Sequence, residues 1–172
     1  MLPNVNPGVL RYSVINGQRR VSKEVFEATY LPAFAETSSI RQTIGDIGLV
    51  ISINDAEGDR VSISYTYSRP ARQEKDPLFK PDRPLDDAKV IPEEFFEELG
   101  QLGELEQPYK EIFDSNKARD DKLLSWLMRS VRLSEQDLVD LPARVGLLGD
   151  AAHAAPIVVS DMMTSAMCLS VS

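Results

Sequence analysis

The residues best suited to bind a ligand lie near the C-terminal end, between Val145 and His153. A short apolar run from Val145 to Leu148 ends at Gly149-Asp150, a pattern typical of a buried strand that opens through a tight turn toward a helix. Gly149 lets the backbone approach a bound group closely, and the Asp150 carboxylate accepts a hydrogen bond from a hydroxyl. The free N–H groups behind this turn would favour an anion or a polarised carbonyl. The sequence therefore predicts a ligand-binding turn, although a core strand with Asp150 as a plain helix N-cap fits the same residues.

Other catalytic and metal-binding arrangements have few residues to draw on. Cys168 is the only cysteine and His153 the only histidine, so we expect neither an internal disulfide nor a cysteine or multi-histidine metal site. A Ser-His-Asp arrangement would have to include His153. We interpret His153 as a turn residue rather than a catalytic base, since no neighbour in the sequence would orient it.

Charge and hydropathy restrict the partners. The net charge is −8, which argues against nucleic acid or an anionic membrane surface as the main partner, because both are polyanions. No apolar run approaches the ~20 residues of a membrane-spanning helix, and the first residues resemble no signal peptide. We therefore expect a cytoplasmic protein that binds a small molecule and can form a homo-oligomer.

The motif carries a family resemblance. Gly149-Asp150-Ala151-Ala152-His153, with Pro156 after it, resembles the Gly-Asp segment of the FAD-dependent aromatic hydroxylases, single-component flavoprotein monooxygenases. Upstream residues resemble the substrate half of fungal members, so that the resemblance covers most of residues 9–157. They are Ser68-Arg69-Pro70-Ala71-Arg72, Leu102-Gly103-Glu104-Leu105-Glu106-Gln107-Pro108 and Trp126-Leu127-Met128-Arg129.

The resemblance implies a cofactor and a chemistry. Gly149, Asp150 and Pro156 would bind FAD, with Asp150 on a ribityl hydroxyl and Pro156 near the flavin ring. A flavin hydroperoxide would hydroxylate an aromatic or polyketide-like substrate, and NAD(P)H would be the reductant. The family's middle sheet covers the substrate, which makes Tyr65, Tyr67 and Arg69 candidate substrate contacts.

Two family features are missing. The Gly-x-Gly-x-x-Gly loop that holds the pyrophosphate of FAD occurs nowhere in the chain. The segment after Pro156 also departs from the family's Gly-x-Gly-x-Asn loop. We therefore expect a truncated form, with a substrate-domain-like region at 1–140 and a remnant of the FAD-binding domain at 141–172.

Periodicity predicts a mixed, α+β fold with an antiparallel sheet. Residues 9–21 alternate as in a strand, and Asn16-Gly17 within them predicts a hairpin turn. Ser22 can cap a helix from Lys23 to about Ala33. Strict alternation across residues 47–68 predicts an antiparallel hairpin with one apolar face and one face of hydroxyls. We interpret the apolar face as core and the hydroxyl face as solvent-exposed; the alternative, which the resemblance implies, is that the sheet forms the floor of a substrate pocket.

The second half of the chain predicts loops and helices. The stretch from Arg69 to Pro92 contains five prolines, Pro92 included, which argues against any regular element there. Arg69 and Arg72 would bind a substrate carboxylate or solvate this turn, and solvation is the simpler interpretation. Apolar stripes predict a helix after Pro92, a short segment from Pro108 and a longer helix opened by Asp114 or Ser115. The stripe of the last helix consists of Leu123, Leu124, Leu127, Met128 and Val131, with Leu127 at its centre.

Three hypotheses about function remain open on sequence alone. The first is a flavin monooxygenase that has lost its N-terminal nucleotide-binding part, and the second is a cofactor-free protein that binds a hydrophobic metabolite. The third is a non-functional remnant.

Overall fold

A computed structural model describes residues 8–72 and 74–130, and all structural statements below concern this part of the chain. The described residues fall into two compact units. The larger is Tyr12–Trp126, and the smaller contains residues 8–11 and 127–130. The expected boundary between residues 140 and 141 lies outside the described residues and stays a prediction.

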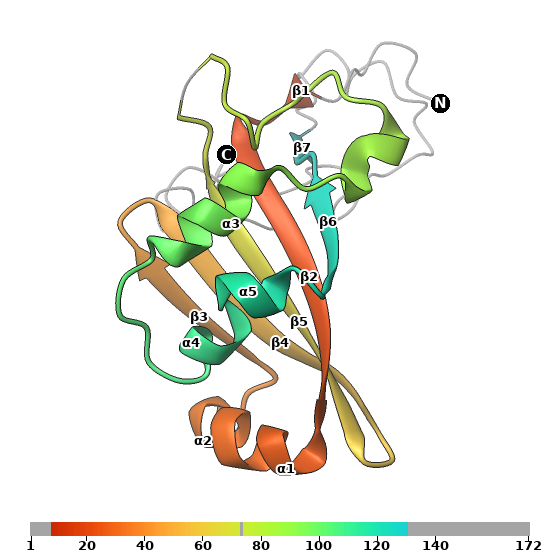
Figure 1. The fold of residues 1–172 in the computed structure, drawn as a ribbon, viewed down its shortest axis with the longest axis vertical. Helices are drawn as coiled ribbons and strands as arrows, with labels where there is room; N and C mark the ends of the chain where they lie inside the picture. Colours follow the sequence, from red (N-terminus) through yellow and green to blue (C-terminus); the bar gives the residue numbers. More distant parts are fainter. Residues whose placement is uncertain (1–7, 73, 131–172) are drawn as a thin grey trace, which may run out of the picture. The chain divides into compact units, whose positions relative to one another are not determined.

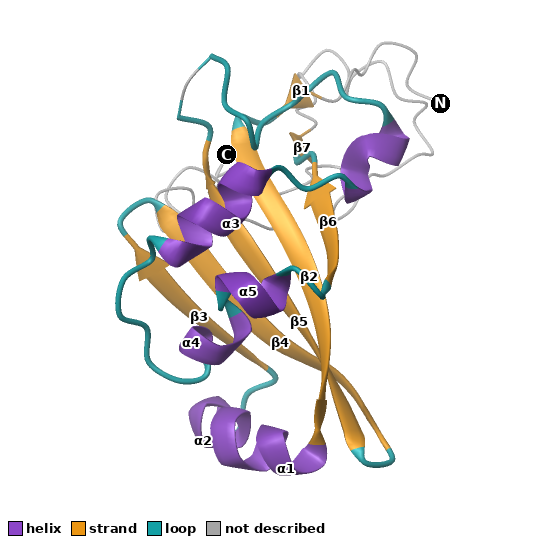
Figure 2. Cartoon of the chain, viewed as in Figure 1, coloured by secondary structure: helices purple, strands orange, loops and turns teal. Residues whose placement is uncertain are grey.

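The larger unit is built on a five-stranded antiparallel sheet with the order β3-β4-β5-β2-β6 (Figure 1). Its strands are β2 (Tyr12–Ser22), β3 (Ser39–Ile44), β4 (Ile47–Glu57), β5 (Arg60–Pro70) and β6 (Lys122–Trp126). With the helices on one side, this sheet confirms the predicted α+β class (Figure 2).

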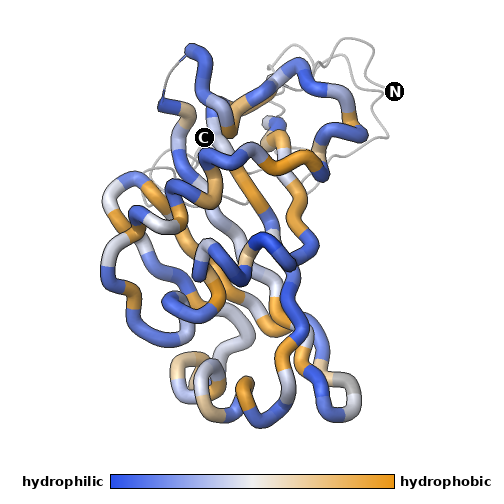
Figure 3. The backbone as a smooth tube through the Cα atoms, in the orientation of Figure 1, coloured by the Kyte–Doolittle hydropathy of each residue, from blue (hydrophilic) through white to orange (hydrophobic). Residues whose placement is uncertain are grey.

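The predicted hairpin is confirmed as β4 and β5. Their turn is at Gly58-Asp59, where Gly58 adopts a φ of 61° that favours glycine. Alternate residues of both strands, such as Ile51 and Ile63, are fully buried. The change between apolar and polar residues along these strands is visible in Figure 3. β4 extends to Glu57, through residues that were expected in the turn. A β-bulge between Ile53 and Asp55 leaves one residue unpaired, and the pairing with β5 continues beyond it.

The predicted turn at Asn16-Gly17 is wrong. Both residues lie inside β2, where Asn16 pairs with Thr66 and Gly17 pairs with Tyr65. Long pairing with β5 on one side and β6 on the other outweighs the local turn preference of the dipeptide.

Short helices cover one face of the sheet and form the core with it. They are α1 (Lys23–Val25), the π-helical turn η1 (Phe26–Tyr30), α2 (Leu31–Phe34), α3 (Glu93–Gly100), α4 (Tyr109–Ile112) and α5 (Ser115–Ala118). The helical stretch after Ser22 is confirmed, and the Ser22 side chain accepts a hydrogen bond from the Val25 amide. The predicted helix after Pro92 and the segment from Pro108 are confirmed as α3 and α4. Their apolar residues, among them Phe95 and Ile112, pack in the core with the sheet.

The long helix expected after Asp114 is wrong. Asp114 does cap a helix, but α5 ends at Ala118 and the chain continues as the strand β6. Leu123 packs partly against the core, whereas Leu124 is 40% exposed on the other face. Leu127 is half-buried and belongs to no helix, so it is not the centre of a helical stripe.

The proline-rich excursion contains one regular element that the sequence did not predict, the 3-10 helix η2 (Leu85–Lys89). The solvated role expected for Arg69 is also wrong, because this residue is 2% exposed. Arg72 is exposed and lies 3.6 Å from Asp46 and 3.7 Å from Glu98.

The smaller unit contains β1 (Gly8–Val9), which pairs antiparallel with β7 (Arg129–Ser130). The Leu10 amide extends this pairing with a 2.9 Å hydrogen bond to the Met128 carbonyl. None of the helices in the described ranges has the length and apolar character needed to span a membrane.

Candidate functional site

The sequence-predicted site residues fall into two groups. Gly149, Asp150 and Pro156, assigned to FAD, lie outside the described residues, as does His153, and their roles stay predictions. Tyr65, Tyr67 and Arg69 lie side by side on β5, on the face that the helices cover.

Arg69 is the centre of a buried charge cluster. Its guanidinium donates to Asp76 at 2.5 and 3.0 Å and to Glu98 of α3 at 2.7 Å through two nitrogens. The Tyr67 hydroxyl donates to the same Glu98. Asp76 also accepts hydrogen bonds from the amides of Arg72 and Leu78, at 3.0 and 2.9 Å. This cluster fastens the start of the proline-rich excursion to both the sheet and α3.

A second cluster repeats the arrangement around Tyr65. The Tyr65 hydroxyl donates to Asp121 at 2.7 Å, and Asp121 accepts three further hydrogen bonds from Arg19 of β2 at 3.0, 3.1 and 2.6 Å. Arg19 also donates to the backbone carbonyls of Glu111 and Ile112, at 2.8 and 3.2 Å. The cluster thereby joins β2, β5, the end of α4 and the residues before β6.

The ionisation of these groups follows from their surroundings. Burial raises the pKa of the Tyr65 and Tyr67 hydroxyls, and the neighbouring carboxylates raise it further. Burial alone would also raise the pKa of Asp76, but hydrogen bonds from Arg69 and two backbone amides lower it to about 2. Glu98 has a lowered pKa because Arg69 and Tyr67 outweigh its burial. At neutral pH both clusters therefore contain neutral tyrosines among paired opposite charges.

The other face of the sheet has a different chemistry. Side chains that alternate with the buried ones carry hydroxyl and amide groups, which bond to one another across the strands. The bonds are Thr66 to Asn16 at 2.6 Å, Ser64 to Asn54 at 2.7 Å, Gln18 to Ser62 at 3.0 Å and Ser52 to Ser39 at 3.0 Å. We call these eight residues the polar face. Their hydroxyl and amide groups can both donate and accept hydrogen bonds.

The polar face is bordered at β6 by two exposed apolar side chains. Leu124 pairs with Asn16 in the sheet, and Trp126 pairs with Val14. They are 40% and 47% exposed. Hydrogen-bonding groups beside an exposed indole form a surface suited to a flat molecule with several oxygen atoms.

Sequence reasoning missed the acidic partners of the two clusters. Glu98 gave a signal, since it lies one turn from Phe95 and next to Leu99 on the buried side of α3, where an acid needs a partner. Asp76 and Asp121 stand in stretches rich in charge, and nothing in their spacing distinguishes them from solvated residues.

The chain is similar to fungal FAD-dependent monooxygenases. It is 32% identical over 161 residues to FAD-dependent monooxygenase aptC of Emericella nidulans, 91% of this chain and 38% of that protein. It is 30% identical to FAD-dependent monooxygenase vrtH of Penicillium aethiopicum and 31% identical to FAD-dependent monooxygenase nscC of Trichophyton rubrum, with the same coverage. The predicted resemblance is thereby confirmed, and FAD is the cofactor that it supports.

These relatives are much longer than this chain, which spans about 38% of their length. No protein-family model matches the chain. No solved structure matches it significantly.

Proposed function

We propose that the Tyr12–Trp126 unit is the substrate-covering part of an FAD-dependent monooxygenase that hydroxylates a small aromatic or polyketide-like molecule. The observation that carries the proposal is the two-sided sheet. The described helices pack on one face, and the other presents the polar face beside Trp126. The similarity to proteins named FAD-dependent monooxygenases supports the reaction class.

The polar face would bind the oxygen atoms of such a substrate. Thr66 and Asn16 lie next to each other in register, as do Ser64 and Gln18, so their side chains form two adjacent rows. A planar substrate with hydroxyl and carbonyl groups would replace some of their mutual hydrogen bonds with its own. Its ring would contact Leu124 and Trp126 at the border.

The two buried clusters lie on the opposite side of the sheet and would hold the polar face in position. Tyr65 and Tyr67 alternate along β5 with Ser64 and Thr66, and their hydroxyls are fixed by Asp121 and Glu98. A rigid β5 holds the alternate side chains in a defined geometry, which lowers the entropy lost on binding. Direct contact of Tyr65, Tyr67 and Arg69 with substrate stays a prediction; in the structure their polar atoms already have protein partners.

Bound FAD would supply the oxygen chemistry, with NAD(P)H as the reductant. The described residues would bind and orient the substrate and exclude water. Gly149, Asp150 and Pro156 are the residues of this chain proposed to contact the flavin.

Trp126 provides the test, because it is the only tryptophan. Titration of the 172-residue chain with a dihydroxyanthraquinone should quench its fluorescence saturably. Thr66→Val, which keeps the shape and removes one hydrogen-bonding group, should weaken binding by about threefold to tenfold. Thr29→Val in η1, on the helix side, is the matched control and should bind as the unaltered chain does.

Two outcomes decide the assignment. Saturable binding that is sensitive to Thr66→Val supports the polar face as the substrate surface. Binding that is unchanged in Thr66→Val contradicts this assignment.

A further inference from the structure

A small cavity lies on the side of the sheet away from the polar face, between the proline-rich excursion and β6. Its volume is about 130 Å³, and its apolar walls include Leu78, Val90 and Pro92. A cavity of roughly 150 Å³ is large enough for a benzene-sized ring. Val90 is 66% exposed although it lines this cavity, so a bound molecule would cover an apolar side chain that now faces solvent.

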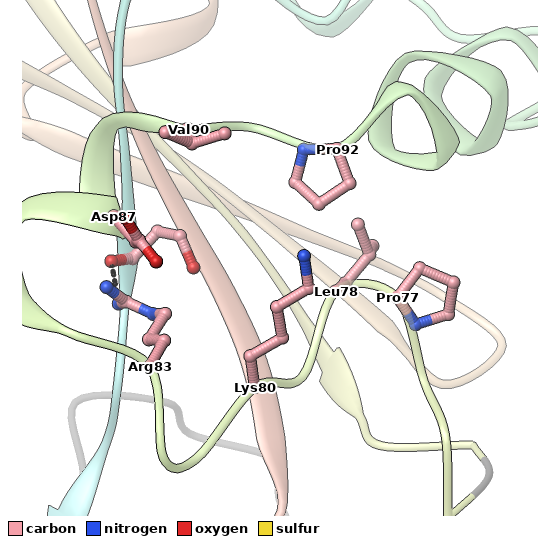
Figure 4. Close-up of a pocket in the computed structure, with 8 residues that line it drawn as sticks. Pro77, Leu78, Lys80, Arg83, Asp87, Val90 and Pro92 are labelled. Atoms are coloured by element: carbon pink, nitrogen blue, oxygen red, sulfur yellow. Dashed lines mark hydrogen bonds between the residues drawn. The ribbon is translucent and has the colours of Figure 1, made fainter.

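Two cations line the cavity without a carboxylate partner. Lys80 and Arg83 form no ion pair with any of the residues that the structure describes, Asp87 included. Figure 4 shows the Arg83 and Asp87 side chains pointing toward each other, while Lys80 extends toward the wall formed by Leu78 and Pro92. By contrast, Arg19 and Arg69 each form ion pairs with two acidic residues.

The Arg83 side chain is held in place but incompletely bonded. One terminal nitrogen donates to the Ser125 carbonyl of β6, and the Arg83 amide donates to the Lys80 carbonyl at 3.3 Å. Its Nε is buried and has no acceptor among the described residues. Buried donors in proteins are nearly always bonded, so the described residues do not use the full hydrogen-bonding capacity of the Arg83 guanidinium.

The charges and the walls of the cavity define the kind of ligand that fits it. The cavity is lined by two cations, Lys80 and Arg83, and one carboxylate, Asp87. Their sum is one net positive charge, which matches a monoanion better than a phosphate dianion. The guanidinium and ammonium groups both donate well to a carboxylate. The apolar walls leave room for a ring or a short hydrocarbon body.

We propose that this cavity binds a small monocarboxylate with an apolar body, whose carboxylate lies between Lys80 and Arg83 and whose body packs against Leu78, Val90 and Pro92. The site is separate from the polar face and does not depend on the proposed monooxygenase activity.

The test is an NMR titration of the ¹⁵N-labelled 172-residue chain with sodium benzoate. The amides of Ser125, Arg83 and Val90 should shift saturably, with a dissociation constant on the order of 1 mM for so small a ligand. Neutral benzamide, which has the same ring, should bind at least about tenfold more weakly, because it cannot form the charged hydrogen bonds. Inorganic phosphate should also bind more weakly.

Lys80→Gln should weaken benzoate binding by about tenfold, and its exposed position keeps the fold intact. Lys89→Gln removes the same charge from an exposed residue of η2 that does not line the cavity, and it should leave binding unchanged. Arg83→Lys keeps the positive charge. It should bind benzoate more weakly than the unaltered chain does, and more tightly than the double variant Lys80→Gln/Arg83→Gln. Absent shifts, equal shifts with benzamide, or equal losses in Lys80→Gln and Lys89→Gln would each overturn the proposal.

Discussion

Gly17 and Tyr65 are paired residues of β2 and β5, and the tyrosine ring occupies the space where any other residue would carry its side chain. A Cβ atom on Gly17 would lie 2.0 Å from Cζ of Tyr65, far closer than atoms in contact can approach. The ring is fixed from its other end by the hydrogen bond to Asp121 and by an edge contact with Phe113 at 5.2 Å between ring centroids. Gly17 is therefore required by packing rather than by a turn.

Gly17→Ala should destabilise the protein by about 1 to 3 kcal/mol, because the added methyl group must displace Tyr65 from a filled core. Urea denaturation measures the change. Gly100→Ala is the control, since an added Cβ at the end of α3 meets no atom within 4 Å. A loss of stability in Gly100→Ala as large as that in Gly17→Ala would show that the effect is not one of packing.

Removing the buried cation at Arg69 should be more damaging than removing an exposed one. Arg69→Met leaves Asp76 and Glu98 together without their partner, and we expect a loss of about 3 to 5 kcal/mol. Arg119→Met removes an exposed guanidinium paired with Glu93 and should leave the denaturation midpoint nearly unchanged. In a double-mutant cycle, Arg69→Met and Asp76→Asn should be strongly non-additive; additive losses would argue against the cluster.

The cluster also predicts acid sensitivity. Asp76 has a pKa of about 2 in the folded chain and an ordinary value of 3.8, so the unfolded chain binds the proton more readily. Its contribution, about 2 kcal/mol, is fully present above about pH 5 and is lost as the pH falls from about 4 to 2. Urea midpoints measured across this range should fall steeply.

Two variants check the origin of this acid sensitivity. Asp76→Asn should flatten the dependence between about pH 4 and 2, since its amide does not titrate there. Asp55→Asn changes an exposed carboxylate of β4 and should keep the original slope. Identical slopes in the two variants would exclude Asp76 as the main source.

The 172-residue chain should bind FAD weakly or not at all. FAD is held largely through its pyrophosphate, and the sequence contains no Gly-x-Gly-x-x-Gly loop. One hydrogen bond from Asp150 is worth roughly 1.5 to 3 kcal/mol, whereas association entropy costs about 4 kcal/mol or more. Calorimetric titration decides the matter: micromolar binding that disappears in Asp150→Ala but persists in Asp120→Ala would contradict the prediction.

Strict local patterns were sufficient for part of the fold. The β4–β5 hairpin follows from alternation over some twenty residues, since only a two-residue period puts Leu49 and Tyr67 on one buried face. The caps at Ser22 and Asp114 follow from their own side chains, which accept the first free amides of the helix. The resemblance to FAD-dependent monooxygenases likewise rested on runs of residues read directly from the chain.

Tertiary structure decided what local patterns leave open. Asn16-Gly17 suits a turn and also a strand that must admit a large ring, and only the pairing with Tyr65 selects the strand. Leu123 and Leu124 fit a helical stripe as well as a strand. They form a strand because β2 offers them its edge opposite β5 for backbone pairing. Arg69, Asp76 and Glu98 are ordinary charged residues in the sequence. They become a buried cluster because the excursion folds back onto the sheet and α3, and burial makes each charge depend on the other two.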